Sequence, residues 1–452
     1  MTVATPGDAT DQLAPSPGGR LTIPQGTALY AGAVLGTGVL ALAVAAAGPA
    51  SLVAWLGLVL LSVPLAATFA ALGARYPDSG GVSTYVRRAY GHRAAAVVGW
   101  CFYFAMPLGG TASAYFADGY VADALGGGHR TVTVTAGALI AVVMLGNAFG
   151  VRVSGRVQLG LGLALATLLL VAVATALPHA RLANLHPFAP HGWAAIGSAA
   201  ALLVWSFAGW EAITHLAGEF RHPARDLPRA TTAALVVVAV LYLGVAGATV
   251  LVLGPVGGTR DAPLAQLLAV GVGGPARGFA ALAAVLMTAG TMNAYYAGAA
   301  KLGAALGRDG ALPAWFARGS STGTVPRRSL AVMAVLTPVT LAATTVAGVG
   351  PRPLVLCTTG SLVTVYVLGA AAARRLLPGG WARRASGVAL VVVVGVLLMS
   401  RWYLLWPLGV TAAALLWCRP RRPAAARYRG RRPGPPSVPP APPAGRADRM
   451  CV

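Results

Sequence analysis

The sequence predicts an all-α membrane protein with about twelve transmembrane helices. Three observations lead to this fold class. Of the 452 residues, 57% are hydrophobic and 10% are charged, and the mean hydropathy of +0.70 is too high for a water-soluble protein. Apolar runs of the length that crosses a bilayer recur along the chain. Basic residues are concentrated in every second connection between these runs.

We expect twelve spans, because a bilayer core of about 30 Å needs ~20 helical residues to cross it. They cover residues 25–47, 51–73, 94–116, 131–150, 157–177, 193–218, 231–253, 277–306, 329–348, 353–373, 386–400 and 402–418. The last two spans are short and are separated by Arg401 alone. We expect disordered cytoplasmic tails at 1–20 and 419–452, the second basic and rich in proline, and a transmembrane domain at 21–418.

The basic residues predict the orientation in the membrane. The net charge is +23, and 28 of the 34 lysines and arginines fall on the side of the two termini. Because short cytoplasmic loops carry the excess of positive charge, we predict cytoplasmic termini for a multi-pass protein of the cell membrane. This placement explains the charge without a nucleic acid partner. The first apolar run, about 20 residues long, exceeds the 7 to 15 residues typical of a secretory signal.

The first span is interrupted at Gly36-Thr37-Gly38, in the middle of an otherwise apolar run. Glycine weakens a helix, so this stretch predicts a break at membrane depth. Backbone inside a membrane loses its helical hydrogen bonds only where it lines a protected cavity. The interruption therefore predicts a small-molecule site near the middle of the bilayer, which is typical of secondary transporters.

The sixth span contains a matching irregularity, because Gly209 and the ionisable Glu211 lie in the middle of an apolar segment. Interrupted spans five apart are typical of a five-plus-five inverted repeat around a central site. We predict this repeat for the first ten spans, with discontinuous helices one and six, followed by two extra helices. The alternative interpretation of each glycine is close helix packing, which is common in membranes.

Glu211 is interpreted as the one carboxylate buried well inside a span, among only eleven acidic residues. Placing a charge at this depth costs at least ~2.5 kcal/mol, so such a residue is partnered, protonated or functional. We predict that Glu211 carries a proton and that His215, four residues later on the same helical face, shares it. The alternative is a neutral glutamic acid that is hydrogen-bonded to unwound backbone.

Four motifs occur in an order that resembles the amino acid/polyamine/organocation permease superfamily. They are the first break, RYPDSGGVSTYVRRAYG at 75–91, FAGWE at 207–211 with the basic segment that follows it, and GRDGALP at 307–313. The resemblance extends from residue 21 to about residue 418. Within the superfamily, residues 207–220 look most like bacterial exporters of methionine and branched-chain amino acids, which are amino acid/proton antiporters.

The resemblance implies that the two breaks bind the ends of an α-amino acid, and elementary physics agrees. A helix N-terminus at the first break presents amides to a carboxylate, while carbonyls at the sixth break accept an ammonium group. The predicted substrate-binding residues are Gly36, Thr37, Gly38, Ser206, Phe207, Ala208, Gly209, Trp210 and Asn293. Candidate walls for the side chain are Phe104, Met106, Tyr295 and Tyr296, although such residues more often serve packing.

We predict a secondary transporter of neutral amino acids that uses alternating access, as an amino acid/proton antiporter that exports its substrate. A proton-coupled importer and an amino acid exchanger remain alternatives, because direction follows the gradients to which binding is linked. Sodium coupling is disfavoured, since Val34 and Leu35 offer only carbonyl ligands. A polytopic membrane enzyme is a distant alternative, and no span shows the polar face of a channel. We expect amino acid, protons and lipid as partners, with no cofactor or metal.

Overall fold

The computed structural model describes residues 21–34, 39–77, 80–125, 129–148, 155–207, 209–211, 214, 217, 220–258, 263–273, 276–319, 325–399 and 401–418. Within these ranges the chain is helical and contains no strand beyond one isolated bridge between Leu21 and Phe220. This bridge joins the start of the first span to the segment that follows the sixth. The all-α fold class predicted from the sequence is confirmed for the described residues.

The helices follow the predicted spans closely. The first half of the chain contains α1 (Ile23–Val34), α2 (Val39–Ala47), α3 (Ser51–Arg75), α4 (Val82–Tyr90), α5 (His92–Leu125), α6 (His129–Ala148), α7 (Gly155–Ala176) and α8 (Ala195–Leu203). The second half contains α9 (Pro223–Ala248), α10 (Pro263–Val272), α11 (Ala276–Arg308), α12 (Arg327–Val346), α13 (Pro351–Leu376), α14 (Trp381–Met399) and α15 (Leu405–Trp417). In the described residues, seven helical stretches are long and apolar enough to cross a membrane, and four apolar helices are shorter.

Two helices lie in connections where the sequence analysis predicts no span. α4 follows α3 and is amphipathic, with Val82, Tyr85 and Val86 buried and Arg87 and Arg88 exposed. Positions three and four residues apart share one face of a helix, so this pattern buries one side of α4 against α5 and α13. α10 is a ten-residue apolar helix that packs against α7 and α11.

The length of α5 corrects one interpretation of the sequence. This helix continues to Leu125, beyond the predicted end of the third span at residue 116. Asp118 therefore lies inside a membrane helix and is 0% exposed. The sequence interpretation did not consider Asp118 as a buried carboxylate, because the predicted span ended at residue 116, whereas the structure buries it near the end of α5.

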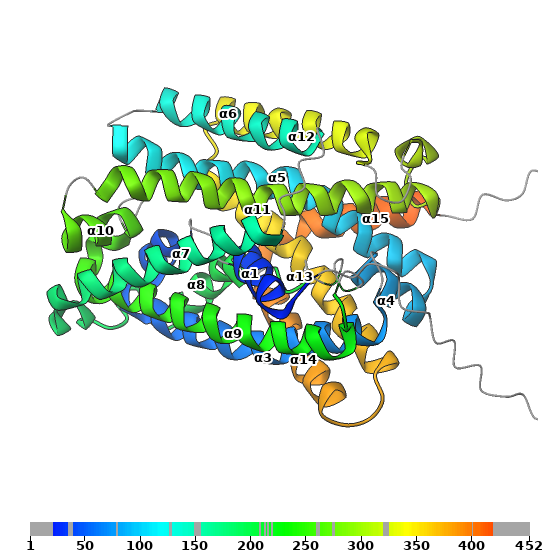
Figure 1. Ribbon diagram of the computed structural model, residues 1–452, viewed down its shortest axis with the longest axis horizontal. Coiled ribbons are helices and arrows are strands. Elements are labelled where there is room, and N and C mark those ends of the chain that lie inside the picture. The colour runs from blue at the N-terminus through cyan, green and yellow to red at the C-terminus, as the bar shows by residue number, and fades with distance from the viewer. Residues whose placement is uncertain are drawn as a thin grey trace, which may run out of the picture. The chain divides into compact units, whose positions relative to one another are not determined.

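The described helices between residues 21 and 418 pack in layers (Figure 1). α6 and α12 pack on α5 and α11, while α3, α9 and α14 form the opposite side. Between them lie α1 and α13, which contact both sides, and α8, which packs on α3 and α14. This arrangement places α1 and α8, which belong to the first and sixth predicted spans, at the centre of the bundle.

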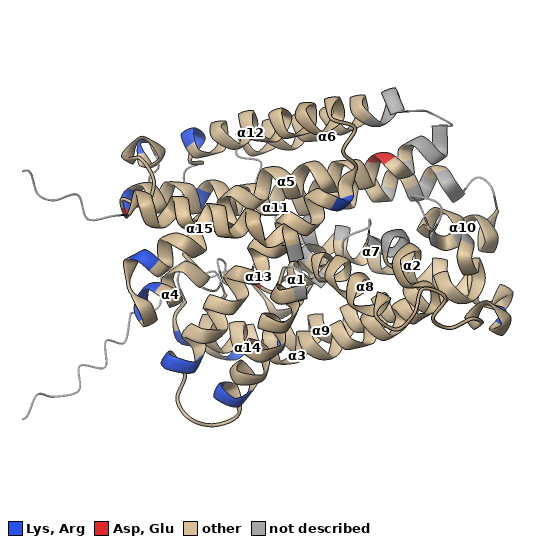
Figure 2. Cartoon of the chain, turned by 180° about the vertical axis from the view of Figure 1, so that it is seen from behind, with Lys and Arg blue, Asp and Glu red and all other residues tan. Residues whose placement is uncertain are grey.

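Basic residues gather at one end of the bundle. Figure 2 shows most of the blue turns at the end that carries α4 and the connection between α13 and α14. The one ion pair described in the structure also lies there, between Arg87 Nη1 and Asp309 Oδ2 at 3.0 Å. Such a charge asymmetry is what the positive-inside rule produces, and cytoplasmic exposure of this end stays a prediction.

Candidate functional site

The first predicted break falls on residues between α1 and α2 that the structure does not describe. α1 ends at Val34 and α2 begins at Val39. The four residues between them lie outside the described residues, and they include the predicted substrate-binding residues Gly36, Thr37 and Gly38. Before this break the structure describes α1 as far as Val34.

Donors from two other helices reach the carbonyl groups at the end of α1. Tyr242 of α9 donates its hydroxyl hydrogen to the Val34 carbonyl at 2.5 Å. Thr291 Oγ1 of α11 donates to the Gly32 carbonyl at 3.0 Å. The end of α1 is thus held from two sides.

The same tyrosine contacts the second break. α8 ends at Leu203 and continues as a 3-10 turn, Val204–Phe207. The hydroxyl oxygen of Tyr242 lies 2.9 Å from the carbonyl oxygen of Ser206 in this turn. Because a phenol has one hydrogen, it donates to one of the two carbonyls at a time. Two carbonyl oxygens, one from each interrupted span, therefore converge on a single point.

Gly209 turns the chain after the 3-10 segment. Its φ of +134° is a conformation that residues with a side chain rarely adopt, so a glycine is needed here. The turned backbone directs the Gly209 N–H to Glu211 Oε2 at 3.0 Å and to the hydroxyl oxygen of Tyr366 at 3.2 Å. The backbone of the sixth span thus binds a carboxylate of its own chain.

Glu211 is the fully buried carboxylate of this site, with 0% of its surface exposed. Besides the Gly209 N–H, its Oε2 accepts a short hydrogen bond from the hydroxyl of Tyr366 in α13. Its Oε1 accepts a longer one, at 3.4 Å, from the hydroxyl of Tyr295 in α11. An ionised carboxylate only accepts hydrogen bonds, so three donors suit the charged form. Two of these donors are hydroxyls, which can also accept a hydrogen bond. They can therefore stay bonded to Glu211 after it takes up a proton.

Trp210 is buried beside α1. Its ring centroid lies 5.7 Å from that of Tyr30. The indole Nε1 is buried and has no hydrogen-bond partner among the described residues, although a buried indole donor usually has one. Of the other predicted residues in this span, the side chain of Phe207 and all of Ala208 and His215 lie outside the described part of the chain.

Asn293 is tied to α6 and not to the breaks. Its Oδ1 accepts a hydrogen bond from Asn147 Nδ2 at 2.7 Å. The residues predicted to line the side chain of the substrate have different partners in the structure. Tyr295 reaches the buried carboxylate, whereas the hydroxyl of Tyr296 lies 3.0 Å from Thr337 Oγ1 of α12. Because an amide oxygen has two lone pairs, Asn293 Oδ1 can accept a second hydrogen bond while it stays bonded to Asn147.

Sequence reasoning missed Tyr242 and Tyr366, the two residues that connect the breaks to the rest of the bundle. Each is a phenol in an otherwise apolar span, and a buried phenol usually bonds to a partner. The argument that selected Asn293, a polar group at membrane depth, applies equally to them. The sequence alone does not identify the hydrogen-bond partners of Tyr242 and Tyr366, because these partners lie in other spans.

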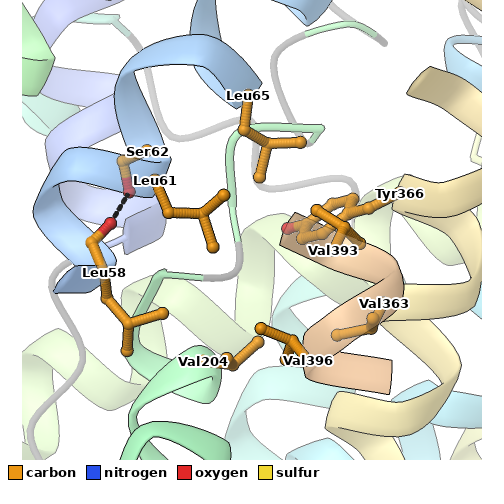
Figure 3. Close-up of a pocket in the computed structure, with 9 residues that line it drawn as sticks. All are labelled: Leu58, Leu61, Ser62, Leu65, Val204, Val363, Tyr366, Val393 and Val396. Atoms are coloured by element: carbon orange, nitrogen blue, oxygen red, sulfur yellow. Dashed lines mark hydrogen bonds between the residues drawn. The ribbon is translucent and has the colours of Figure 1, made fainter. Parts of the chain in front are cut away.

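A small cavity lies beside Tyr366, between α3, α13 and α14. Its volume is about 20 Å³, and Figure 3 shows the residues that line it: Leu58, Leu61, Ser62, Leu65, Val204, Val363, Tyr366, Val393 and Val396. The Ser62 hydroxyl donates to the Leu58 carbonyl at 2.9 Å, which leaves the walls almost entirely apolar. A cavity of this size holds about one or two waters. It is too small for an amino acid, and a substrate site at the breaks stays a prediction.

The described residues offer no metal centre. No group of three or more His, Cys, Asp or Glu side chains among them is placed to hold a metal ion. The partners described for Glu211 are tyrosine hydroxyls and a backbone N–H group.

A family model described as amino acid permease matches residues 21–443. Over 409 residues the chain is 33% identical to the uncharacterized amino acid permease YecA of Bacillus subtilis, which covers 87% of this chain and 94% of the relative. Both matches extend over nearly the whole described membrane region.

Two further relatives match about half of each chain. The L-methionine/branched-chain amino acid exporter YjeH of Escherichia coli is 36% identical over 235 residues, 50% of this chain and 54% of its own. The branched-chain amino acid permease BcaP of Bacillus subtilis is 29% identical over 240 residues, 48% of this chain and 52% of its own.

Proposed function

The chain belongs to the amino acid permease family, and on that premise we propose that it exchanges a neutral aliphatic amino acid for protons across the cell membrane. Amino acid transport follows from the family. The substrates named for two relatives, methionine and branched-chain amino acids, support an aliphatic side chain. The observation that carries the proton part of the proposal is Glu211, a fully buried carboxylate bonded to the turned backbone of the sixth span.

The two converging carbonyls support an ammonium site. The carbonyl oxygens of Val34 and Ser206 both lie within hydrogen-bond distance of the Tyr242 hydroxyl. Two acceptors around one point suit an ammonium group, which has three hydrogens to donate. In this proposal the ammonium group of the substrate replaces the phenol hydrogen at these carbonyls. Substrate binding therefore releases Tyr242 from the breaks.

The carboxylate of the substrate binds on the other side of the first break. Gly36 and Gly38 let bare backbone amides approach it, with Thr37 between them, and a helix N-terminus favours negative charge. Among the described acidic residues, Glu211 alone bonds to the backbone of a break. A site that binds both ends of a zwitterion through backbone groups favours a substrate without net charge.

Protonation of Glu211 changes the hydrogen bonds at the sixth break. The ionised group accepts from Tyr366, Tyr295 and the Gly209 N–H. After protonation it becomes a donor, so one of these contacts has to reverse or break. Because Gly209 is only three residues from Ser206, this change reaches the carbonyls that bind the ammonium group. Proton and substrate thus influence each other's binding, and antiport follows when each opposes the other.

Glu211→Gln tests the proposal in proteoliposomes. Glutamine keeps the shape and much of the hydrogen bonding of the protonated form but cannot release a proton. We expect counterflow of labelled leucine or methionine between two pools to survive, while uptake driven by a pH gradient is lost. Asp309→Asn is the matched control, because it makes the same chemical change at an exposed position.

The two assays separate the possible outcomes. Driven uptake by Glu211→Gln at the wild-type rate would contradict proton coupling through this residue and leave it a structural hydrogen-bond acceptor. Wild-type protein without counterflow of any neutral amino acid would contradict the substrate class. Loss of driven uptake in the Asp309→Asn control as well would point to a general defect.

A further inference from the structure

Asp118 is a second carboxylate buried in the membrane region, and the proposed mechanism does not use it. It is 0% exposed, and neither of its carboxylate oxygens has a hydrogen-bond partner among the described residues. Glu211 differs sharply, because three donors reach its two oxygens. A buried polar group without a partner is uncommon in native structures and calls for an explanation.

The lack of donors indicates which form of Asp118 is present in this conformation. Burying an ionised carboxylate without hydrogen bonds costs far more than burying a neutral polar group. A neutral carboxylic acid avoids that cost. Asp118 is therefore protonated here, and it can ionise only in a conformation that brings donors or water to it.

Such donors exist one helical turn away. Tyr115, three residues before Asp118, places its hydroxyl 3.1 Å from Thr344 Oγ1 and 3.0 Å from Thr345 Oγ1 at the end of α12. Residues three apart lie on neighbouring parts of one helix surface. These three hydroxyls form a polar group at the level where α12 ends. A small shift of α12 along α5 changes which side chains the two threonine hydroxyls contact.

Asp118 also lies near one end of its helix. α5 begins at His92 and ends at Leu125, so the rise from Asp118 is roughly 10 Å to the end and nearly 40 Å to the start. A proton reaches it over the shorter distance from the membrane face at which α5 ends. By the predicted orientation this face is the outer one.

The two buried carboxylates lie at different depths. The Tyr115 hydroxyl contacts the last turn of α12, and α13 begins at Pro351 just beyond that turn. Tyr366, which bonds to Glu211, lies fifteen residues into α13, a rise of about 22 Å. At a separation of that order two charges interact by less than about 1 kcal/mol at an effective dielectric constant of 20. The two groups therefore titrate independently.

No charged group is described in contact with Asp118. The titratable residues at this end of the helices packed against it are Tyr115, Tyr120 and Asp123 on α5, His129 and Arg130 on α6, Arg277 on α11 and Arg352 on α13. α12 contributes the hydroxyls of Thr344 and Thr345. The side chains of Tyr120, Asp123, His129, Arg130 and Arg277 lie outside the described part of the structure, and no ion pair to Asp118 is described.

We propose that Asp118 is a second proton-exchange site of this transporter, loaded from the membrane face at which α5 ends and separate from Glu211. The inference rests on proton-coupled transport as proposed above. It explains why a carboxylate without partners is held inside α5. It also predicts that more than one proton accompanies each amino acid, because each carboxylate carries its own.

Asp118→Asn tests the proposal, because asparagine keeps the size of the neutral acid and cannot ionise. The number of protons per amino acid is obtained in proteoliposomes from the substrate gradient that just balances a set pH gradient. We expect this number to fall by one in Asp118→Asn, and the dependence of transport on the pH at the α5 end to flatten. Counterflow at equal pH on both sides reports folding and substrate binding, and it should stay near the wild-type rate.

A second measurement uses the unmodified protein. A hydrophobic carbodiimide labels protonated carboxyl groups within a membrane, and peptide mapping by mass spectrometry locates the label. We expect labelling of Asp118 that decreases as the pH at that face rises. An unchanged proton number in Asp118→Asn, or labelling that is absent or independent of pH, would overturn the inference while leaving the proposed function intact. A wild-type protein that ignores the pH gradient would instead contradict the proposed function itself.

Discussion

Tyrosine hydroxyls supply much of the polar contact at the interrupted spans. Tyr242, Tyr295 and Tyr366 come from three different helices, and each donates to a carbonyl or carboxylate of a broken segment. A phenol suits this position, because its ring packs among apolar side chains while its hydroxyl provides one donor. It does so without placing a charge in the membrane. A small shift of α9, α11 or α13 therefore changes the hydrogen bonds at the breaks directly.

Tyr242→Phe should weaken the contact between the two breaks. The variant keeps the ring against Trp55, whose centroid lies 4.8 Å away, but removes the only described donor to both the Val34 and Ser206 carbonyls. Losing a donor to buried carbonyls costs about 1–3 kcal/mol. We expect a lower thermal unfolding temperature in detergent and a larger stabilisation by added substrate, because the ammonium group then fills the vacant position.

Tyr76→Phe is the control for this prediction, since Tyr76 lies near the surface and the one hydrogen bond described for its hydroxyl comes from the exposed side chain of Arg75. Equal unfolding temperatures for wild-type protein and Tyr242→Phe would show that the hydroxyl contributes nothing to the contact. A drop in Tyr242→Phe with no extra stabilisation by substrate would instead place the ammonium group elsewhere.

Among the elements, α5 and α11 approach closely through glycines. A Cβ built on Gly110 of α5 would lie 1.7 Å from the hydroxyl oxygen of Tyr296, and one on Gly99 would lie 2.4 Å from Leu306. In membranes, where lipid is as apolar as leucine, such close contact replaces the hydrophobic effect as the force that holds helices together. The α5–α11 contact positions Tyr295, next in sequence to Tyr296, toward Glu211.

Gly110→Ala should therefore disturb the pair of helices. The Tyr296 ring is 1% exposed and has no room to move aside, so the added methyl group forces α5 and α11 apart. Overpacking of this kind costs about 1–3 kcal/mol. We expect a lower unfolding temperature and slower counterflow, measured on purified protein and in proteoliposomes.

Gly290→Ala in α11 is the matched control, because a Cβ at that position meets nothing within 4 Å. It should match or slightly exceed the wild-type stability, since alanine favours a helix more than glycine does. Equal behaviour of the two variants would mean that the close approach at Gly110 is not needed for the packing of α5 on α11.

For the whole molecule, the distribution of charge predicts the orientation. Most basic turns of the described structure gather at one end of the bundle (Figure 2), and the tail after residue 418 adds nine arginines to the same predicted side. Membrane insertion retains such residues in the cytoplasm. The sequence offers a natural reporter of this prediction, because Cys451 lies in the tail.

Labelling of Cys451 with a membrane-impermeant maleimide tests the orientation. In a variant whose other cysteines, Cys101, Cys357 and Cys418, are replaced by alanine, we expect labelling in inside-out vesicles and none in intact cells. Moving the single cysteine to His191, an exposed residue between α7 and α8, should reverse the pattern. Labelling of Cys451 from outside intact cells would refute cytoplasmic termini.

The sequence by itself determined the class of protein and located its apolar helices, and it predicts the site of the first break. These depend on composition and local pattern: ~20 apolar residues are needed to cross a bilayer, and glycines weaken a helix wherever it packs. The same local reasoning selected Gly209 and Glu211. It failed for Asp118, because the end of a helix inside a membrane depends on neighbouring helices as well as on hydropathy.

Only the tertiary structure decided which groups meet. The partners of Glu211 include Tyr366, 155 residues away, and the two breaks share Tyr242, which lies 208 residues from Val34 and 36 from Ser206. A hydrogen bond forms within about 3 Å, so its partners are chosen by which helices pack side by side and at what height. Periodicity along one chain segment carries no such information. For the same reason, the absence of a described partner for Asp118 could be seen only after the helices around α5 were in place.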